Sequence, residues 1–211
     1  ITPNTKNGCF IVFEGIDGSG KSTQISLLKE HIEEHSINCM TTMEPSNGPI
    51  GTLLRQFLSG RIKGEETTLT ALFAADRLDH LNNPVNGIRK LLEDGIAVIS
   101  DRYVFSNYAY QSVSVPLEWI MKCNEMANET VRPDCHIFID VAPETAMDRV
   151  SKGRHQTDIY ETLDRLTDVR ERYLDLIHRM EDVENIIIID GNRPEKEIAD
   201  DIWAKVCHYF V

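Results

Sequence analysis

The stretch Gly15-Ile16-Asp17-Gly18-Ser19-Gly20-Lys21-Ser22-Thr23 decides how the rest of the chain is interpreted. It matches the phosphate-binding loop pattern of Gly, any four residues, and Gly-Lys-Ser/Thr. It follows the apolar run Cys9–Phe13 and precedes an amphipathic segment, which is the strand–loop–helix context that the pattern requires. Because glycines can adopt backbone angles closed to other residues, successive N–H groups can point inward and bind phosphate oxygens at the start of the next helix.

Every residue of this loop, 15–23, is therefore a candidate ligand of ATP. Gly15 and Gly20 are expected to adopt the unusual angles, and Gly18 to leave the backbone bare. Lys21 is expected to reach the terminal phosphates as a point charge, and Ser22 Oγ to ligate Mg²⁺.

The composition bounds the class of protein. The chain has 211 residues, 41% hydrophobic and 27% charged, which predicts one domain over 1–211 with a short lid. The net charge of -12 argues against nucleic acid or an anionic membrane as the main partner. The apolar runs are strand-length, so no signal peptide or membrane span is expected. The scattered spacing of the cysteines predicts neither a zinc site nor a disulfide framework. It therefore favours a reducing, cytoplasmic location. The cysteines are Cys9, Cys39, Cys123, Cys135 and Cys207.

Apolar strands alternate with helices along the chain. The predicted strands are Cys9–Glu14, Cys39–Met43, Ile96–Ser100, Cys135–Val141 and Ile186–Asp190. The predicted helices include Ser22–His35, Pro49–Ser59, Thr67–Asn82, Val85–Glu93, Phe105–Ser112, Leu117–Asn128, Pro143–Ser151, Asp158–Met180 and Glu195–Phe210. This alternation predicts an α/β three-layer fold, a five-stranded parallel sheet buried on both faces by helices, as in P-loop NTPases. A short polar loop, Lys152–Thr157, is expected within a lid of about 150–161.

In such a sheet, ligands bind beyond the carboxyl ends of the strands. Asp101 follows a strand that is expected to neighbour the strand before the phosphate-binding loop. A carboxylate there can hold Mg²⁺ or position the phosphoryl acceptor. Arg102 adjoins it, and Arg55 and Arg77 lie on two other helices. If these arginines converge on one crevice, they suit a second phosphate group.

Several segments together resemble the thymidylate kinase family, from Cys9 to about Tyr173. The segments are Phe-Glu-Gly-Ile-Asp-Gly-Ser-Gly-Lys-Ser-Thr-Gln (13–24), Glu-Pro (44–45), Pro-Ile-Gly-x-x-x-Arg (49–55), Leu-Phe-Ala-Ala-Asp-Arg (72–77), Asp-Arg-Tyr (101–103), Ser-x-x-Ala-Tyr-Gln (106–111) and Pro-Asp (133–134). The resemblance implies transfer of the γ-phosphate of ATP to dTMP, giving dTDP, with Mg²⁺. It also implies a homodimer formed through a helical face.

The resemblance assigns residues to the phosphate and sugar of dTMP. Arg55 and Arg102 would grip the phosphate. Asp17 would bond the 3′-hydroxyl, and Tyr110 would pack beneath the sugar, where its ring can exclude a 2′-hydroxyl. The resemblance also places Glu44 and Ser106 among the dTMP-binding residues.

The resemblance likewise assigns residues to the base. Phe73 would stack on the thymine ring. Arg77 would contact the base edge, and Asn107 and Gln111 would read it by hydrogen bonds.

Lys21, Asp101 and Arg102 are the expected catalytic residues. One further cation, which would stabilise the transition state, is less clearly assigned. Some thymidylate kinases carry an arginine within the phosphate-binding loop, where this chain has Gly18 and Ser19. Others supply it from the lid, and Arg154 is the expected cation here. Related lids often carry arginine in an Asp/Glu-Arg-Phe/Tyr-Glu segment, whereas this chain reads Asp158-Ile159-Tyr160-Glu161. Lys152 or Arg149 could therefore supply the cation instead.

Two alternatives stay open at this point. The chain could be another nucleoside or nucleoside monophosphate kinase, or a P-loop switch protein that binds a nucleotide to control a partner. A GTPase normally shows Asn-Lys-x-Asp after a late strand, but this chain has Asp190-Gly191-Asn192-Arg193, which does not match.

Overall fold

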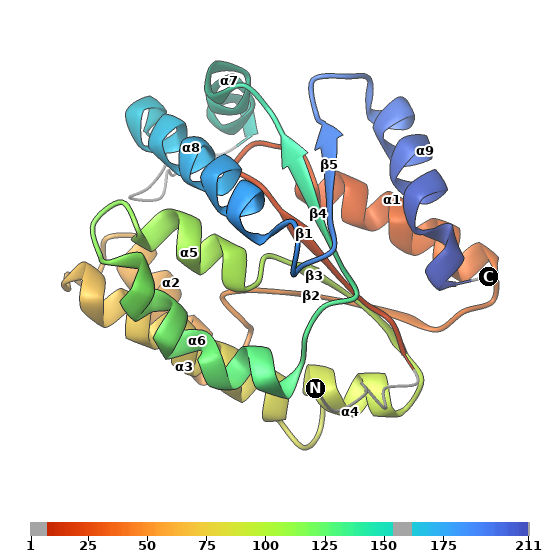
Figure 1. Ribbon diagram of the computed structural model, residues 1–211, viewed down its shortest axis with the longest axis horizontal. Helices are drawn as coiled ribbons and strands as arrows, with labels where there is room; N and C mark the ends of the chain where they lie inside the picture. The colour runs from red at the N-terminus through yellow and green to blue at the C-terminus, as the bar shows by residue number, and fades with distance from the viewer. Residues whose placement is uncertain (1–7, 154–161, 211) are drawn as a thin grey trace.

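A five-stranded sheet forms the centre of the molecule, a computed structural model that describes residues 8–153 and 162–210. The strands are β1 (Phe10–Glu14), β2 (Cys39–Met43), β3 (Ala97–Asp101), β4 (Cys135–Asp140) and β5 (Ile186–Asp190). Every neighbouring pair is parallel, and the order is β2-β3-β1-β4-β5 (Figure 1). The predicted α/β fold with a five-stranded parallel sheet is confirmed.

Helices cover both faces of this sheet. α1 (Lys21–Glu34) and α9 (Glu195–Val206) pack together on one side, and α5 (Val104–Gln111) and α8 (Leu163–Met180) pack together on the other (Figure 1). α3 (Glu66–Asn82) contacts α5, and both contact α6. The remaining bounds are α2 (Pro49–Leu58), α4 (Ile88–Glu93), α6 (Leu117–Thr130) and α7 (Pro143–Gly153). Within the described residues no helix is long and apolar enough to cross a membrane.

Burial follows the position of each strand in the sheet. β1 is central, and its apolar side chains Phe10–Phe13 are fully buried. β2 lies at an edge, and Met40 and Met43 remain 48% and 49% exposed. The predicted burial on both faces therefore applies to the central strands, because helices on both sides remove their side chains from water.

The register of the sheet brings the carboxyl ends of β1, β2 and β3 close together. Phe13 of β1 lies opposite Asp101 of β3, and the N–H of Arg102 donates to the carbonyl of Phe13 at 2.8 Å. The N–H of Glu44, just after β2, donates to the carbonyl of Asp101 at 2.9 Å. The expectation that the strand before Asp101 neighbours the phosphate-binding loop strand is confirmed.

Two predicted boundaries around the lid are wrong. The helix predicted from Asp158 begins at Leu163, because Thr162 has extended angles and its Oγ1 caps the helix by accepting from the N–H of Arg165 at 3.3 Å. The predicted loop Lys152–Thr157 is wrong at Lys152 and Gly153, which belong to α7. Residues 154–161 lie outside the described part of the chain.

Two further helix boundaries differ from prediction. The helix predicted over Val85–Glu93 begins only at Ile88, because Asn83 Oδ1 accepts from the N–H groups of Val85 and Asn86 and holds a turn there. The helix predicted to reach Phe210 ends at Val206 and continues as the 3₁₀ turn Cys207–Tyr209.

Candidate active site

The phosphate-binding loop has the backbone that its glycines predict. Gly15, Gly18 and Gly20 have φ of 145°, 79° and 96°, in the region that L-residues rarely adopt. Gly20 is the N-cap of α1, so the loop ends at the positive end of that helix. A Cβ at Gly18 would lie 2.3 Å from the carbonyl oxygen of Ala146 in α7. Gly18 is therefore required by both its angle and the close approach of α7.

Lys21 is buried at the base of this loop. Its Nζ donates to the carbonyl oxygens of Gly15 and Ile16, each at 3.1 Å. Burial and the positive charge of Arg102 lower the pKa of Lys21, while Asp101 and Asp17 oppose that change. The ammonium group of Lys21 is therefore held against the backbone of the loop by two of its carbonyl oxygens.

Ser22 and Asp101 form the candidate Mg²⁺ site. Ser22 Oγ donates to Asp101 Oδ2 at 3.2 Å. The other carboxylate oxygen, Asp101 Oδ1, is buried and has no hydrogen-bond partner. Among the described residues no cluster of three or more His, Cys, Asp or Glu could hold a metal. This arrangement fits Mg²⁺, which is commonly held by one or two protein groups together with phosphate oxygens and water.

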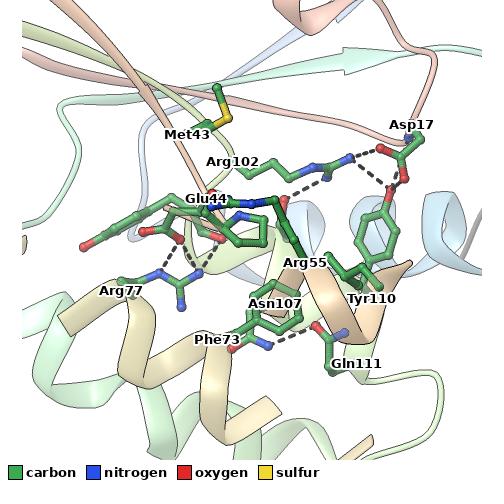
Figure 2. Close-up of a pocket in the computed structure, with 14 residues that line it drawn as sticks. Asp17, Met43, Glu44, Arg55, Phe73, Arg77, Arg102, Asn107, Tyr110 and Gln111 are labelled. Atoms are coloured by element: carbon green, nitrogen blue, oxygen red, sulfur yellow. Dashed lines mark hydrogen bonds and ion pairs between the residues drawn. The ribbon is translucent and has the colours of Figure 1, made fainter. Parts of the chain in front are cut away.

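A second cleft opens beside the loop, lined by the residues that Figure 2 draws. All ten residues predicted to bind dTMP line it: Asp17, Glu44, Arg55, Phe73, Arg77, Arg102, Ser106, Asn107, Tyr110 and Gln111. Sequence reasoning missed four further lining residues, Met43, Pro45, Leu58 and Tyr103. They come from β2 and the loop after it, from α2, and from the turn after β3, so the cleft lies where these elements meet.

Arg102 joins the two parts of the site. Its φ is 76°, an angle rarely adopted by a non-glycine residue. Nη1 donates to the Gly15 carbonyl and to Ser106 Oγ, each at 3.0 Å. Nη2 donates to Asp17 at 2.7 Å, and the guanidinium lies over the Tyr110 ring, 4.9 Å from its centroid (Figure 2). These partners hold the strained backbone and aim the cation along the cleft.

Asp17 is an anion in a cationic setting. Burial alone would raise its pKa, but the charges of Arg102 and Lys21 and hydrogen bonds from Tyr110 and Arg102 lower it to about 2. Its Oδ2 accepts from the Tyr110 hydroxyl at 2.9 Å. The carboxylate is thus charged at neutral pH and held between the loop and α5.

Arg77 lies deeper, on the wall of the cleft. Its side chain is 1% exposed and forms an ion pair of 2.6 Å with the equally buried Glu44. It also donates to the carbonyl of Tyr103 at 3.0 Å and to Asn124 Oδ1. A buried charge needs such partners. Much of its donor capacity is therefore committed to the protein.

Arg55 reaches the cleft from α2. Its Nη1 donates to the carbonyl oxygens of Pro45 and Ser46, at 3.0 and 2.7 Å, and Nη2 donates to Thr52 Oγ1 at 3.2 Å. These bonds fix the side chain against the loop after β2. Figure 2 shows it facing the same cleft as Arg102 and Phe73.

Glu14 is a structural member of the site that sequence reasoning missed. It is 2% exposed, and one carboxylate oxygen accepts from the N–H groups of Tyr103 and Ser106 at the start of α5. The other accepts from Ser106 Oγ and from the Tyr173 hydroxyl, at 2.5 and 2.9 Å. Burial raises the pKa of Glu14, and these hydrogen bonds and Arg102 oppose it. Its position as the last residue of β1, directly before the loop, is the only sequence signal for this role.

The three candidate lid cations are placed unequally. Arg154 lies outside the described residues. Lys152 is exposed and pairs with Asp148 at 2.6 Å, one turn earlier on α7. Arg149 instead lies against the phosphate-binding loop: Nη2 donates to the carbonyl of Gly191 at 3.1 Å, and Nη1 lies 3.5 Å from the Gly18 and Ser19 carbonyl oxygens.

A further pocket adjoins the loop on the α1 and α9 side. It is lined by Ser19, Gly20, Thr23, Gln24, Arg149, Gly191, Arg193, Glu195 and Ile198. Arg193 and Glu195 were not among the predicted site residues. This pocket continues the phosphate-binding loop away from the second cleft, so the loop lies between two hollows.

A loop built for a nucleoside triphosphate that opens onto a second, arginine-lined cleft defines the class of P-loop kinases acting on a phosphorylated acceptor. The chain belongs to the thymidylate kinase family, whose sequence model, described as thymidylate kinase, matches residues 13–202.

Individual relatives agree along nearly the whole chain. A thymidylate kinase of Symbiobacterium thermophilum is 38% identical and covers 92% of this chain and 90% of the relative. A probable thymidylate kinase of Methanobrevibacter smithii is 37% identical, with 95% of each chain covered. One of Methanocaldococcus jannaschii is 38% identical, with 89% of each covered. The predicted family is confirmed.

Proposed function

We propose that the protein transfers the γ-phosphoryl group of ATP to the 5′-phosphate of dTMP, giving ADP and dTDP. The observation that carries this proposal is Arg102, which contacts Gly15 and Asp17 of the phosphate-binding loop and also lines the second cleft. A cation that contacts the phosphate-binding loop and also lines the second cleft suits a reaction in which a phosphoryl group passes from one anion to another.

The acceptor phosphate would bind between Arg102 and Arg55. Guanidinium groups bind phosphate oxygens through paired, charge-assisted hydrogen bonds. Asp17 and Tyr110 form the adjoining polar wall, and they would contact the sugar 3′-hydroxyl and its ring face. A carboxylate facing the phosphate itself would repel it, which supports placing Asp17 at the sugar.

The base would occupy the end of the cleft that Phe73, Arg77, Asn107 and Gln111 line. The Phe73 ring supplies an apolar face on which a pyrimidine can stack. Asn107 and Gln111 are almost wholly buried, at 2% and 1% exposed, so their hydrogen-bonding groups are held in fixed directions. Glu44 holds Arg77 in place through the buried ion pair.

In the transfer, an oxygen of the dTMP phosphate attacks the γ-phosphorus while the bond to the β–γ bridging oxygen breaks and ADP leaves. Lys21 and the loop N–H groups would stabilise the β and γ oxygens, and Arg102 would hold the attacking phosphate in line. Ser22 and Asp101 would hold Mg²⁺, which when bound neutralises charge that develops on the phosphate oxygens.

A further cation is needed to stabilise the transferring group, and Arg154 remains our candidate. Arg149 is the second candidate, supported by its position against the carbonyl oxygens of Gly18 and Ser19. Lys152 is the least favoured candidate for this role, because its ammonium group already pairs with Asp148. Residues 150–161 would act as the lid of a single domain.

The enzyme is further proposed to be a cytoplasmic homodimer that needs Mg²⁺ and binds neither nucleic acid nor membranes. The cytoplasmic assignment is supported by the five cysteines, which form no disulfide within the described residues. The dimer is supported by the family and by half-exposed apolar side chains on α6, of which Trp119 and Met126 are 40% and 62% exposed. Light scattering after size-exclusion chromatography tests the dimer.

ADP release with ATP, Mg²⁺ and a panel of acceptors tests the function. The panel is dTMP, dUMP, dCMP, dGMP, UMP and thymidine. Turnover with dTMP, weaker turnover with dUMP and none with thymidine is expected. Preference for thymidine or another monophosphate would replace this proposal by another kinase activity. ATP binding without turnover of any acceptor would favour a nucleotide-dependent switch.

A further inference from the structure

Asn124 is a buried amide directly behind the candidate base site. It lies on α6, is fully buried, and is not among the residues that line the cleft. Its Oδ1 accepts from Arg77 Nη1, and its Nδ2 donates to Asn107 Oδ1 and to the Ile120 carbonyl, each at 2.8 Å. Asn107 Nδ2 in turn donates to Gln111 Oε1 at 3.0 Å (Figure 2). Three amides thus continue from one arginine along the base end of the cleft.

The direction of these hydrogen bonds follows from the chemistry of the Arg77 guanidinium. A guanidinium has only donors, so the oxygen of Asn124 must face Arg77 and its NH₂ group must face away. The NH₂ of Asn124 then requires an acceptor, so the oxygen of Asn107 faces it and the NH₂ of Asn107 points to Gln111. Without Asn124, nothing in this set of contacts distinguishes the oxygen of Asn107 from its nitrogen.

We propose that Asn124 is a positioning residue that selects thymine over cytosine by fixing the Asn107 amide and the Arg77 guanidinium. This inference rests on the proposed function, because it assumes that a pyrimidine monophosphate occupies the cleft. Asn124 acts through Asn107 and Arg77 and has no contact with the base.

The two bases differ at the edge that Arg77 and Asn107 would read. Thymine presents a carbonyl oxygen at C4 and an N3–H donor, whereas cytosine presents an amino group and a bare N3 acceptor. Arg77 can only donate, which suits the carbonyl. The oxygen of Asn107 keeps a second lone pair that can accept from N3–H. A reversed Asn107 amide would instead offer N–H to N3 of cytosine.

Two substitutions separate the parts of this argument. Asn124→Asp keeps an acceptor for Arg77 but cannot donate to the Asn107 oxygen, so the Asn107 amide is expected to reverse. Asn124→Leu has a similar side-chain volume and removes the hydrogen bonds to Arg77 and Asn107. Asn128→Asp is the matched control, because Asn128 lies one turn later on α6 and donates to the Tyr108 hydroxyl at 2.9 Å instead.

The measurement is kcat/KM for dTMP, dUMP and dCMP in wild type and the three variants. Uracil presents the same edge as thymine, so the dTMP/dUMP ratio is expected to stay unchanged throughout. The dTMP/dCMP ratio is expected to fall about 10-fold or more in both Asn124 variants, because a buried polar group loses its partner, and to keep its wild-type value in Asn128→Asp. A general loss of structure would instead lower kcat/KM for all three substrates together and leave their ratios unchanged.

The outcomes separate this inference from the proposed function. If the wild type does not phosphorylate dTMP, the proposed function fails. If the wild type does so but both Asn124 variants keep the wild-type dTMP/dCMP ratio, the positioning role of Asn124 is overturned.

Should neither Asn124 variant fold, the wild type itself supplies the test. Hydrogen exchange of the side-chain NH₂ groups, followed by NMR, is expected to be far slower for Asn124 and Asn107 than for the exposed Asn86. Exchange as fast as that of Asn86 would overturn the inference.

Discussion

Asp17 and Arg102 form an ion pair of 2.7 Å that joins the phosphate-binding loop to the turn after β3. The pair is only partly exposed, with 23% of the Asp17 side chain and 15% of the Arg102 side chain accessible. Arg102 also donates to Gly15, and Tyr110 donates to the second oxygen of Asp17. The loop and the second cleft are therefore held in one geometry before any ligand binds.

The ion pair predicts a pH dependence of stability. The pKa of Asp17 falls from 3.8 to about 2 on folding, so its contribution is present above the unfolded value and is lost as the pH falls through the folded value. We expect wild type to exceed Asp17→Asn by roughly 2 kcal/mol in free energy of unfolding at pH 7, with the gap closing between about pH 4 and 2. Urea unfolding at several pH values measures the gap, and a gap that stays constant down to pH 2 would contradict the prediction.

Replacing Arg102 by lysine tests the shape of the cation and keeps its charge. Arg102 uses two nitrogens for Gly15, Ser106 and Asp17, and an ammonium group cannot reproduce that fork. Arg102→Lys is expected to lower kcat/KM for dTMP about 100-fold through weaker binding and poorer alignment.

The matched control is Arg89→Lys, because Arg89 is exposed on α4 and pairs only with Glu93 in the described contacts. Steady-state kinetics with both variants decide the matter. Equal activity of the two variants would remove Arg102 from the proposed site.

Two loop glycines separate backbone strain from steric overlap. The added Cβ of Gly20→Ala would lie 3.9 Å from Arg149 Nη1, an ordinary contact distance. The variant is therefore destabilised only by its positive φ, by about 1 kcal/mol. Gly18→Ala adds an overlap with the Ala146 carbonyl at 2.3 Å. Urea unfolding is expected to show Gly18→Ala as the less stable variant. The opposite order would mean that α7 yields readily at the loop.

Arg149 and Lys152 provide the contrast between the described lid cations. Arg149→Ala is expected to raise KM for ATP and lower kcat, since the side chain lies against the phosphate-binding loop and lines the adjoining pocket. Lys152→Ala removes only an exposed ion pair with Asp148 and is expected to leave both constants within about twofold. Arg154→Ala in the same assay locates the transition-state cation: an unchanged kcat would transfer that role to Arg149.

Much of the candidate site could be predicted because its residues follow a simple rule. Gly15–Ser22 follow β1, and Asp101–Tyr103 lie at the end of the neighbouring parallel strand β3 and just after it; such strands present their carboxyl ends at one edge of the sheet. The boundaries of α7 and α8 could not be predicted as well. Local polarity suggested a loop at Lys152, but the end of a helix depends on caps such as Thr162, whose strength shows only in the folded backbone.

The sequence by itself determined the α/β alternation and the phosphate-binding loop, because strand periodicity and glycine chemistry act over short stretches. Ten of the residues around the second cleft were predicted through the resemblance of their segments to the thymidylate kinase family. Only the tertiary structure decided where buried polar groups find their partners. Glu14 caps α5 through a contact across the sheet edge, and Asn124 meets Arg77 from a helix 47 residues later. Burial makes an unpaired polar group costly, so packing in three dimensions, which no local pattern records, selects these pairs.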